Sequence, residues 1–390
     1  MLDDNNLRMK KVILLTACTA AVLLSGCSDN ELASVGDGIG TSAQNAIGFH
    51  VVGNQAETRA TPITPDNITD TDFNVYAYIN NAEDKDGDPF MGGNDTALGS
   101  NGINISHNGK VWGYTNDKDL RYWPTTALNF YAVNPATTGM FSWQFSNAKK
   151  EIAYNCFDEY AKDNKGEYSN AKNIDVMYAV AKGQTYTQKN SGIVKFNFKH
   201  ILSQVVFQAK TQYANMEVEI KALSIHNFYG GGTFTIPEGE PSQTNWKPTP
   251  LTYHSNGFTA VMDQSIKVNK TDEVTNISTQ GPMLLVPQKL TKWDRTGNTE
   301  AANTAKQSYL KITCKIKQSG AYLFGDDTNF GVLYVPFGAD WQPGKRYIYT
   351  LIFGGGFDAQ GQAILMPINF EAETTNWVND SNNNDININK

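Results

Sequence analysis

The sequence predicts an all-β protein organised as two β-sandwiches in tandem. Apolar and polar residues alternate with a period of two along most of the chain, as expected for strands with one buried face. Clusters of Gly, Pro and Asn separate these runs and suit tight turns. A helical pattern occurs in one short stretch. Many short strands with turns between them are typical of sandwiches rather than of a parallel α/β sheet.

The predicted strands follow one another with short connections. In the run 47–52, Ile47, Phe49 and Val51 share one face. The other strands expected in the first half are 73–79, 128–134, 175–181, 192–200 and 203–210. Those expected in the second half are 216–228, 232–236, 258–262, 282–287, 309–316, 332–337, 346–353 and 363–370.

Residues 147–161 carry the helical pattern, because Cys156 lies four residues from both Ile152 and Tyr160. Cys314 alternates with apolar residues and is expected on the inner face of a strand. Both cysteines are interpreted as small buried hydrophobic residues rather than as a disulfide or a metal pair.

The start of the chain predicts export as a lipoprotein. Two lysines, an apolar run of about a dozen residues and small residues before Cys27 are typical of a secretory signal. The run is too short to span a bilayer permanently. Leu24-Ser25-Gly26-Cys27 resembles the bacterial lipobox, in which the cysteine receives the lipid; Cys18 has a similar but less favourable setting. Translation from Met9 instead of Met1 would give a more conventional signal.

Composition excludes some partners. Removing residues 1–27, with three basic and two acidic side chains, changes the net charge from −7 to −8. An acidic chain without a basic run argues against nucleic acid, because phosphate binding requires clustered Lys and Arg. The remaining length suits two domains of ordinary size.

The residues provide no case for catalysis, a cofactor or a metal. The five histidines lack metal-binding spacing, and no HExxH, CxxC or GxSxG motif occurs. His200 shares strand parity with Phe196 and Phe198 and is expected in the core, bonded to Ser203. Asp84, Asp86 and Asp88 have the spacing of a calcium loop. Pro89 stands where that loop needs its turn glycine, so a solvated acidic loop is the favoured interpretation. The seven tryptophans are expected to pack in the cores rather than to form sugar platforms.

Several segments in a fixed order resemble the Bacteroidetes fimbrillin-like proteins, the Mfa-like subunits and lipoproteins of type V pili. The segments are ETRATPIT, DFNVYAYI, YWPTTALNFYAVNP, VKFNFKHILSQVVFQAK, LLVPQKL and VPFGADWQPGKRYIYTLIF. The resemblance runs from the lipobox to about Trp377. It implies two transthyretin-like β-sandwiches, lipoprotein export to the outer membrane and cell surface, proteolysis after an arginine, and assembly by strand exchange.

The resemblance and the turn pattern together predict the organisation of the chain. The boundary between the two sandwiches is expected in the polar stretch 211–215, to within about fifteen residues. The expected parts are a signal peptide (1–27), an N-terminal segment with a removable strand (28–60), a first sandwich (61–211), a second sandwich (212–378) and a polar tail (379–390).

Arg59 fits the implied processing step. It is the only Lys or Arg between Cys27 and Lys85, so a trypsin-like or arginine-specific protease has one site there, between Arg59 and Ala60. The site lies in a polar stretch of the kind that proteases cut. Cleavage would separate the anchor and Ile47, Phe49 and Val51 from the body. If that strand fills a slot in the first sandwich, its loss opens a groove for a strand of another subunit. Alternatively, the segment 28–60 is only a tether.

The strand that would be donated to another subunit has one candidate segment. The segment 363–377 alternates through Ile364, Met366, Ile368 and Phe370, and is either the donor or the last strand of the second sandwich. The tail after it offers only Ile386 and Ile388, which slightly favours a tip or accessory role over a shaft role. Thr96 lies in a triplet, Asp95-Thr96-Ala97, that resembles an O-glycosylation site of this phylum.

The expected function is therefore that of a non-enzymatic fimbrial or adhesin subunit. Its expected partners are other pilus subunits, an arginine-specific protease, and host or bacterial surface ligands, with membrane contact through the lipid only. The main alternative is a permanently anchored glycan-binding lipoprotein, which would expose coplanar Trp or Tyr side chains. A hydrolase, which needs carboxylates converging in a cleft, comes third.

Overall fold

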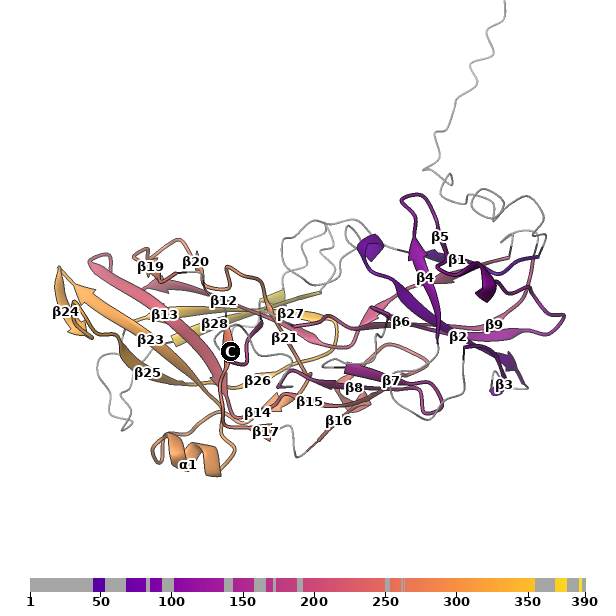
Figure 1. Ribbon diagram of the computed structural model, residues 1–390. Helices are drawn as coiled ribbons and strands as arrows, with labels where there is room; N and C mark the ends of the chain where they lie inside the picture. Colours follow the sequence, from indigo (N-terminus) through magenta and orange to yellow (C-terminus); the bar gives the residue numbers. More distant parts are fainter. Residues whose placement is uncertain are drawn as a thin grey trace, which may run out of the picture.

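The structure is a computed structural model, and its regular structure is almost entirely β-strand. It describes residues 45–52, 68–81, 85–92, 102–136, 143–157, 166–170, 173–187, 192–249, 253–260, 262, 264–354, 369–376 and 386–387. Within these ranges there is one short α-helix, α1 (Thr299–Thr304), and there are three 3-10 helices, η2 (Ile68–Asp70), η4 (Asp117–Asp119) and η7 (Gln243–Asn245). The predicted all-β class is confirmed (Figure 1).

A nine-stranded sheet dominates the first half of the chain. Its order is β10-β1-β5-β4-β2-β6-β9-β11, with β3 also paired to β2. The strands are β1 (Gly48–Val51), β2 (Phe73–Asn80), β3 (Asp86–Met91), β4 (Ile103–His107), β5 (Trp112–Tyr114), β6 (Leu128–Asn134), β9 (Met177–Gln184), β10 (Ile193–Phe196) and β11 (Lys199–His200).

This sheet curls so that part of one face encloses a core of its own. The ring of Phe49 on β1 lies 6.4 Å from that of Phe130 on β6, although three strands separate β1 from β6 in the sheet order. We call this group of buried side chains the slot core. It contains Ile47, Phe49, Val51, Phe73, Val75, Ala77, Met91, Ile103, Ile105, Leu128, Phe130, Ala132, Ala179, Val194 and Phe196.

The opposite face of the nine-stranded sheet packs on a four-stranded sheet of order β16-β15-β8-β7. Its strands are β7 (Trp143–Ser146), β8 (Glu151–Asn155), β15 (Gly231–Thr235) and β16 (Trp246–Pro248). Tyr76 meets Phe145 with ring centres 4.9 Å apart, and Tyr178 meets Phe234 at 5.5 Å. These side chains belong to a second, larger core that continues into the other half of the molecule.

The helix predicted at 147–161 is wrong over its described part. Residues 147–150 form the turn between β7 and β8, and residues 151–155 are β8 itself. Ile152, Tyr154 and Cys156 are all buried, which is a period of two. A spacing of four residues, as between Ile152 and Cys156, fits one face of a helix and also one face of a strand. The spacing alone therefore did not distinguish the two.

Two six-stranded sheets form the second half. One has the order β20-β12-β27-β28-β29, with β21 also on β12. Its strands are β12 (Ser203–Thr211), β20 (Thr275–Asn276), β21 (Met283–Leu285), β27 (Lys345–Phe353), β28 (Asn369–Asn376) and β29 (Ile386–Asn387). The other has the order β18-β13-β23-β24, with β19 on β13 and β25 on β23. Its strands are β13 (Met216–His226), β18 (Phe258–Ala260), β19 (Ile266–Val268), β23 (Tyr309–Gln318), β24 (Ala321–Phe324) and β25 (Gly331–Pro336).

Two short pairs complete the described strands. β14 (Phe228–Tyr229) pairs with β17 (Tyr253–His254), and β22 (Lys289–Leu290) pairs with β26 (Ala339–Asp340). Cys314 lies on β23 and is buried, as predicted. Burial raises the pKa of the Cys314 thiol and the pKa of the Cys156 thiol. Neither cysteine is in a disulfide.

The sheet pairings divide the chain differently from the linear boundary at 211–212. β12 pairs in parallel with β27 along its length, from Gln204↔Arg346 to Thr211↔Phe353, so it belongs to the second half. In the sheet pairings the change from the first half to the second therefore falls at about residue 202. The hairpin β15–β16, expected in the second sandwich, instead pairs with β8 beside the nine-stranded sheet. The hairpin β15–β16 thus comes from the second half of the sequence but packs with the strands of the first half.

Among the described residues, no helix has the length and apolar character needed to cross a membrane.

Candidate functional site: the slot occupied by β1

β1 fills a gap between two strands that are distant from it in the sequence. It runs parallel to β10, with Gly48↔Ile193 through Val51↔Phe196 in register. On its other side it meets β5 in antiparallel orientation at Phe49↔Trp112. Gly48 N donates to Gly192 O at 3.0 Å and Val52 N donates to Phe196 O at 2.8 Å. β1 is therefore held as an interior strand, and without it β10 and β5 would each present an unpaired edge.

The inward side chains of β1, together with that of Ile47 just before it, are anchors in the slot core. Ile47, Phe49 and Val51 are 0%, 5% and 8% exposed. The ring of Phe49 stacks on Phe196 at 5.9 Å and meets Tyr114 edge-on at 5.6 Å. Burial of such side chains stabilises by about 1.5–3 kcal/mol each. The strand is held by its side chains as well as by its backbone.

Two polar side chains donate to backbone carbonyls at the start of β1, one just before the strand itself and one on the wall beside it. Tyr114 Oη donates to Ile47 O at 3.0 Å, and Trp123 Nε1 donates to Gly192 O at 2.9 Å. Burial raises the pKa of Tyr114, so its hydroxyl stays protonated and able to donate. Because Ile47 O is a main-chain atom, the bond from Tyr114 holds a strand without reading its sequence.

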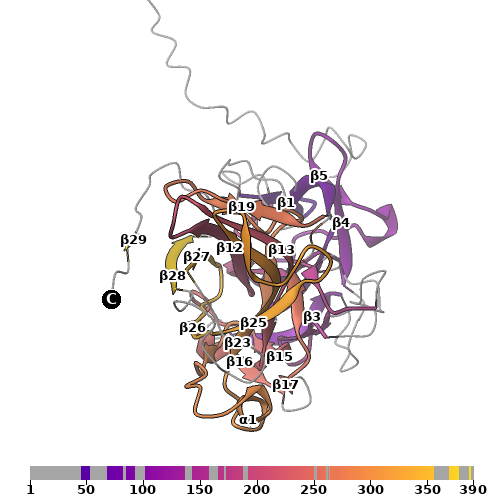
Figure 2. The same ribbon diagram turned by 90° about the vertical axis from the view of Figure 1, so that its left-hand side faces the viewer.

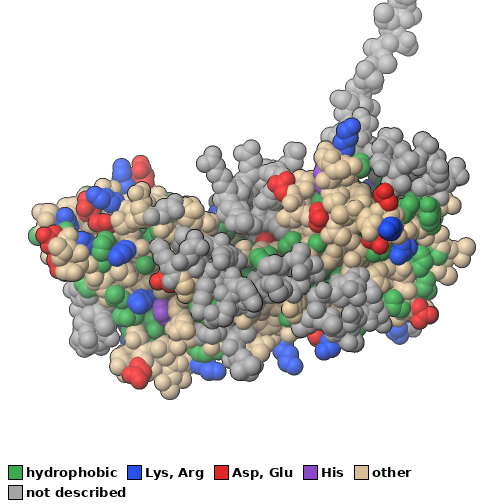
Figure 3. All heavy atoms as spheres, in the orientation of Figure 1, with side chains coloured by type: hydrophobic (Ala, Val, Ile, Leu, Met, Phe, Trp, Pro, Cys, Tyr) green, Lys and Arg blue, Asp and Glu red, His purple; other side chains and the backbone are tan. Residues whose placement is uncertain are grey.

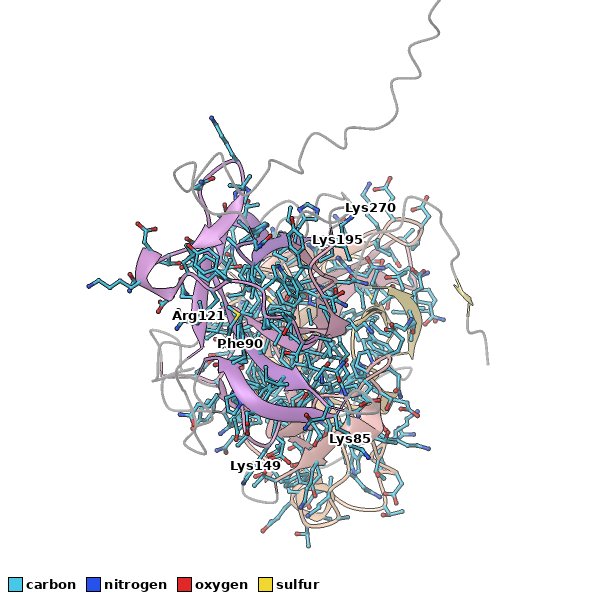
Figure 4. All side chains as sticks on the ribbon, turned by 90° about the vertical axis from the view of Figure 1, so that its right-hand side faces the viewer. Lys85, Phe90, Arg121, Lys149, Lys195 and Lys270 are labelled. Carbon is cyan, nitrogen blue, oxygen red and sulfur yellow. The ribbon has the colours of Figure 1, made fainter. Side chains whose placement is uncertain are left out.

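Gly192 is required where β10 meets β1. Its φ is +76°, and a Cβ there would lie 2.8 Å from Ala46 O and 2.9 Å from Trp123 Nε1. Only glycine avoids both the backbone strain and the clash. Arg121 and Lys195 come from the two segments that flank β1, and Figure 4 views the molecule from this end. Arg121 O accepts from Ile47 N at 2.9 Å. Lys195 lies opposite His50 in the register of β10 and β1.

The structure describes some of the predicted site residues and not others. Ile47, Phe49 and Val51 lie together in the slot. Phe370 lies in β28, opposite Leu351 of β27, at one side of a six-stranded sheet. Cys27, Arg59, Ala60, Thr96, Ile364, Met366 and Ile368 lie outside the described residues.

Sequence reasoning missed the residues that form the walls of the slot. Tyr114, Trp123 and Gly192 are far from β1 in the chain, and their partners are set by the pairing of β1 with β5 and β10. Residue 192 began a predicted strand, but alternation does not show which strand lies beside it.

Other polar groups have structural partners. Asp86 Oδ1 accepts from Asn129 and Tyr131, and Asp86 Oδ2 pairs with Lys150 Nζ at 3.5 Å. His200 is buried as predicted, but its Nδ1 faces Asp175 at 3.1 Å, while Ser203 Oγ donates to Gln342 O. In the part of the chain that the structure describes, no three His, Cys, Asp or Glu side chains are placed to hold a metal ion.

All five tryptophans whose side chains are described have packing roles. Trp246, Trp293 and Trp341 are buried, and Trp112 and Trp123 pack against the slot core. Of the described aromatic side chains, Tyr122, Tyr186, Tyr213 and Tyr322 are exposed. They come from separate loops and strands.

These features define a class of β-protein in which one strand, β1, lies inside a sheet whose other strands come from residues 73–200. The family model described as fimbrillin-like matches residues 58–377. The chain belongs to the fimbrillin-like family. No curated protein matches it.

The solved structures that match this chain include three proteins described as having a proposed role in cell adhesion. One from Bacteroides ovatus has a TM-score of 0.43 and 16% identity, covering 86% of this chain and 98% of that chain. One from Bacteroides uniformis has a TM-score of 0.45 and 12% identity, covering 86% of this chain and 100% of that chain. One from Parabacteroides distasonis has a TM-score of 0.43 and 10% identity, covering 85% and 96%.

Proposed function

We propose that this protein is a structural subunit of a cell-surface fimbria, exported as a lipoprotein on Cys27 and activated by cleavage between Arg59 and Ala60. Cleavage releases the N-terminal segment, β1 leaves its slot, and a strand of another subunit takes its place. Membership of the fimbrillin-like family supports the fimbrial or adhesin role and a place at the cell surface.

The observation that carries the proposal is the position of β1. An interior strand with three buried anchors lies N-terminal to Arg59, and every other strand of its sheet lies C-terminal to Arg59. One cut at Arg59 therefore separates β1 covalently from the rest of the sheet, while all the other strands of the sheet stay on one chain. The emptied slot offers an apolar groove and two strand edges, which is the arrangement that an added strand recognises.

The direction of the pairing specifies the incoming strand. It must run parallel to β10 and place apolar side chains at three alternate positions, like Ile47, Phe49 and Val51. A tip or accessory subunit needs only this slot, whereas a shaft subunit also needs a second surface for the next subunit.

The test is mild trypsin treatment of the full precursor, followed by intact mass and size analysis. The expected result is one early cut after Arg59, with oligomers appearing afterwards. An excess of a peptide covering residues 45–52 should suppress the oligomers, because it refills the slot. The matched control is Arg59→Gln, which should stay uncut at this position and monomeric. Early cutting elsewhere, or a cut protein that neither oligomerises nor takes up the peptide, would contradict the proposal.

A further inference from the structure

A lysine and an aspartate meet where the nine-stranded sheet faces the four-stranded sheet. Asp86 begins β3 of the first sheet, and Lys150 ends the turn between β7 and β8 of the second. Lys150 Nζ lies 3.5 Å from Asp86 Oδ2, and the Lys150 and Asp86 side chains are 16% and 23% exposed. In Figure 1 and Figure 2, β3 lies toward β15 and β16 and away from β1 and β5. The pair therefore lies apart from the slot.

Aromatic rings enclose the amine of this lysine. Lys150 Nζ lies 3.7 Å from the centre of the Tyr78 ring and 4.8 Å from that of Tyr131, and both tyrosines belong to the larger core. Nζ also donates to Asn147 O at 2.7 Å, which fixes its position. Burial lowers the pKa of Lys150 from its ordinary value of 10.5 to about 8, although the charge of Asp86 opposes the change. A fraction of the amine is therefore neutral, and so nucleophilic, near neutral pH.

Two hydrogen-bond donors hold one oxygen of the carboxyl group. Asp86 Oδ1 accepts from Asn129 Nδ2 at 3.0 Å and from Tyr131 Oη at 3.2 Å. Asn129 Oδ1 accepts from Gly183 N at 2.9 Å, so the orientation of this amide is fixed. Burial raises the pKa of Tyr131, so its hydroxyl stays protonated and able to donate. Two fixed donors on Oδ1 stabilise the negative charge that develops there when a nucleophile attacks Cγ, as an oxyanion hole does.

We propose that Lys150 and Asp86 form an intramolecular isopeptide bond. The ammonium group gives a proton to Asp86 Oδ2, and the neutral Nζ attacks Cγ while Asn129 and Tyr131 hold the charge on Oδ1. The Nζ–Cγ bond forms, the Cγ–Oδ2 bond breaks, and Oδ2 leaves as water with two protons that came from Nζ. The ion pair and its products are both electrically neutral, so no other reactant is required. Groups held side by side react as if at very high concentration, which favours this condensation.

Other lysine–carboxylate pairs of the described residues have a different setting. Charged side chains of both signs are scattered over the surface in Figure 3. Glu238 and Glu240, which pair with Lys182 and Lys199, are 83% and 84% exposed. Water solvates both members of such a pair and keeps them ionised. These pairs therefore stay ion pairs and provide an internal control.

The bond would join the two sheets of the first half covalently. It closes a loop from residue 86 to residue 150 and so restricts the unfolded chain, as a disulfide would. Cys156 and Cys314 are not in a disulfide, so they make no such link. Both linked residues follow Arg59 in the sequence, and the inference holds whether or not the chain is cut there.

The test is mass spectrometry of the purified, denatured full chain. Its intact mass should be lower than the mass of the sequence by one water. A complete trypsin digest should miss the cleavage after Lys150, because trypsin does not cut after an acylated lysine. The digest should also contain the peptide 86–110 joined to the peptide 150–162.

Three variants identify the atoms involved. Lys150→Arg keeps the charge but cannot form the amide, and Asp86→Ala removes the carboxyl group, so both should have the full mass of their sequences. Lys199→Arg is the matched control, because it changes the amine of an exposed pair, and it should still lose one water. An unaltered chain with its full mass and with cleavage after Lys150 would overturn the proposal and leave a plain ion pair. Loss of water in Lys150→Arg would place the reaction elsewhere and overturn it too.

Discussion

Replacing Phe49 with Ala tests whether β1 is held by its side chains. The change removes a ring that is 5% exposed and contacts Phe196, Tyr114 and Phe130 at 5.6–6.4 Å. Truncation of a buried Phe costs about 3–5 kcal/mol, partly from transfer and partly from the cavity left behind. We expect a loss of this size in the free energy of unfolding of the uncut chain, measured by urea denaturation.

The cut chain shows whether this energy belongs to the slot. Because the ring belongs to the segment that the proposed cleavage would release, Phe49→Ala should also speed the departure of that segment after cutting at Arg59, followed by size exclusion over time. Phe258→Ala is the matched control. It empties a buried site in the second half, beside Phe157 and Phe228, and should cost similar stability without speeding release. A loss below about 1 kcal/mol in Phe49→Ala, within the range of ordinary substitutions, would refute the reasoning. Equal release in both variants would refute it too.

Two further predictions concern other contacts. Gly192→Ala should destabilise the uncut chain by about 1–3 kcal/mol, from a strained positive φ and the close carbonyl of Ala46, as measured by urea unfolding. Gly109→Ala has a similar φ of +87° with nothing within 4 Å, so it should cost less, and an equal cost would contradict the clash. Burial lowers the pKa of His226 from its ordinary value of 6.5 to about 4. Between these values the unfolded chain binds a proton that the folded chain does not, so stability should fall as the pH falls from 6.5 toward 4. His226→Gln should show a shallower fall in unfolding midpoint over that range, and an unchanged slope would contradict the assignment.

The strands of this fold were predictable because their alternation is local. The runs 128–134, 203–210 and 346–353 coincide with β6, β12 and β27 to within a residue at each end. Each of these strands buries one face in a core, so apolar residues occur at every second position of its sequence. β8 was missed because Ile152 and Cys156 satisfy a period of four as well as two.

The neighbours of each strand were not predictable, and the site depends on them. Alternation identified β1 as a strand and gave its inward face. It did not show that β1 lies between β5 and β10, because pairing between distant segments leaves no local pattern. For the same reason the hairpin β15–β16 was placed with the wrong half, and Tyr114 and Trp123 were not recognised as part of the slot.

The two faces of β2 explain why the body would keep its fold if β1 left the slot, as the proposed exchange requires. Phe73, Val75 and Ala77 point into the slot core, whereas Tyr76 and Tyr78 point into the larger core shared with the four-stranded sheet. β6 and β9 divide their side chains between the two cores in the same way. β1 contributes to the slot core alone. If β1 left, the central strands would stay anchored by the larger core, to which the second half also contributes through β15 and β16. The energy of β1 is thus separable from that of the body, which is the physical condition for exchanging one strand for another.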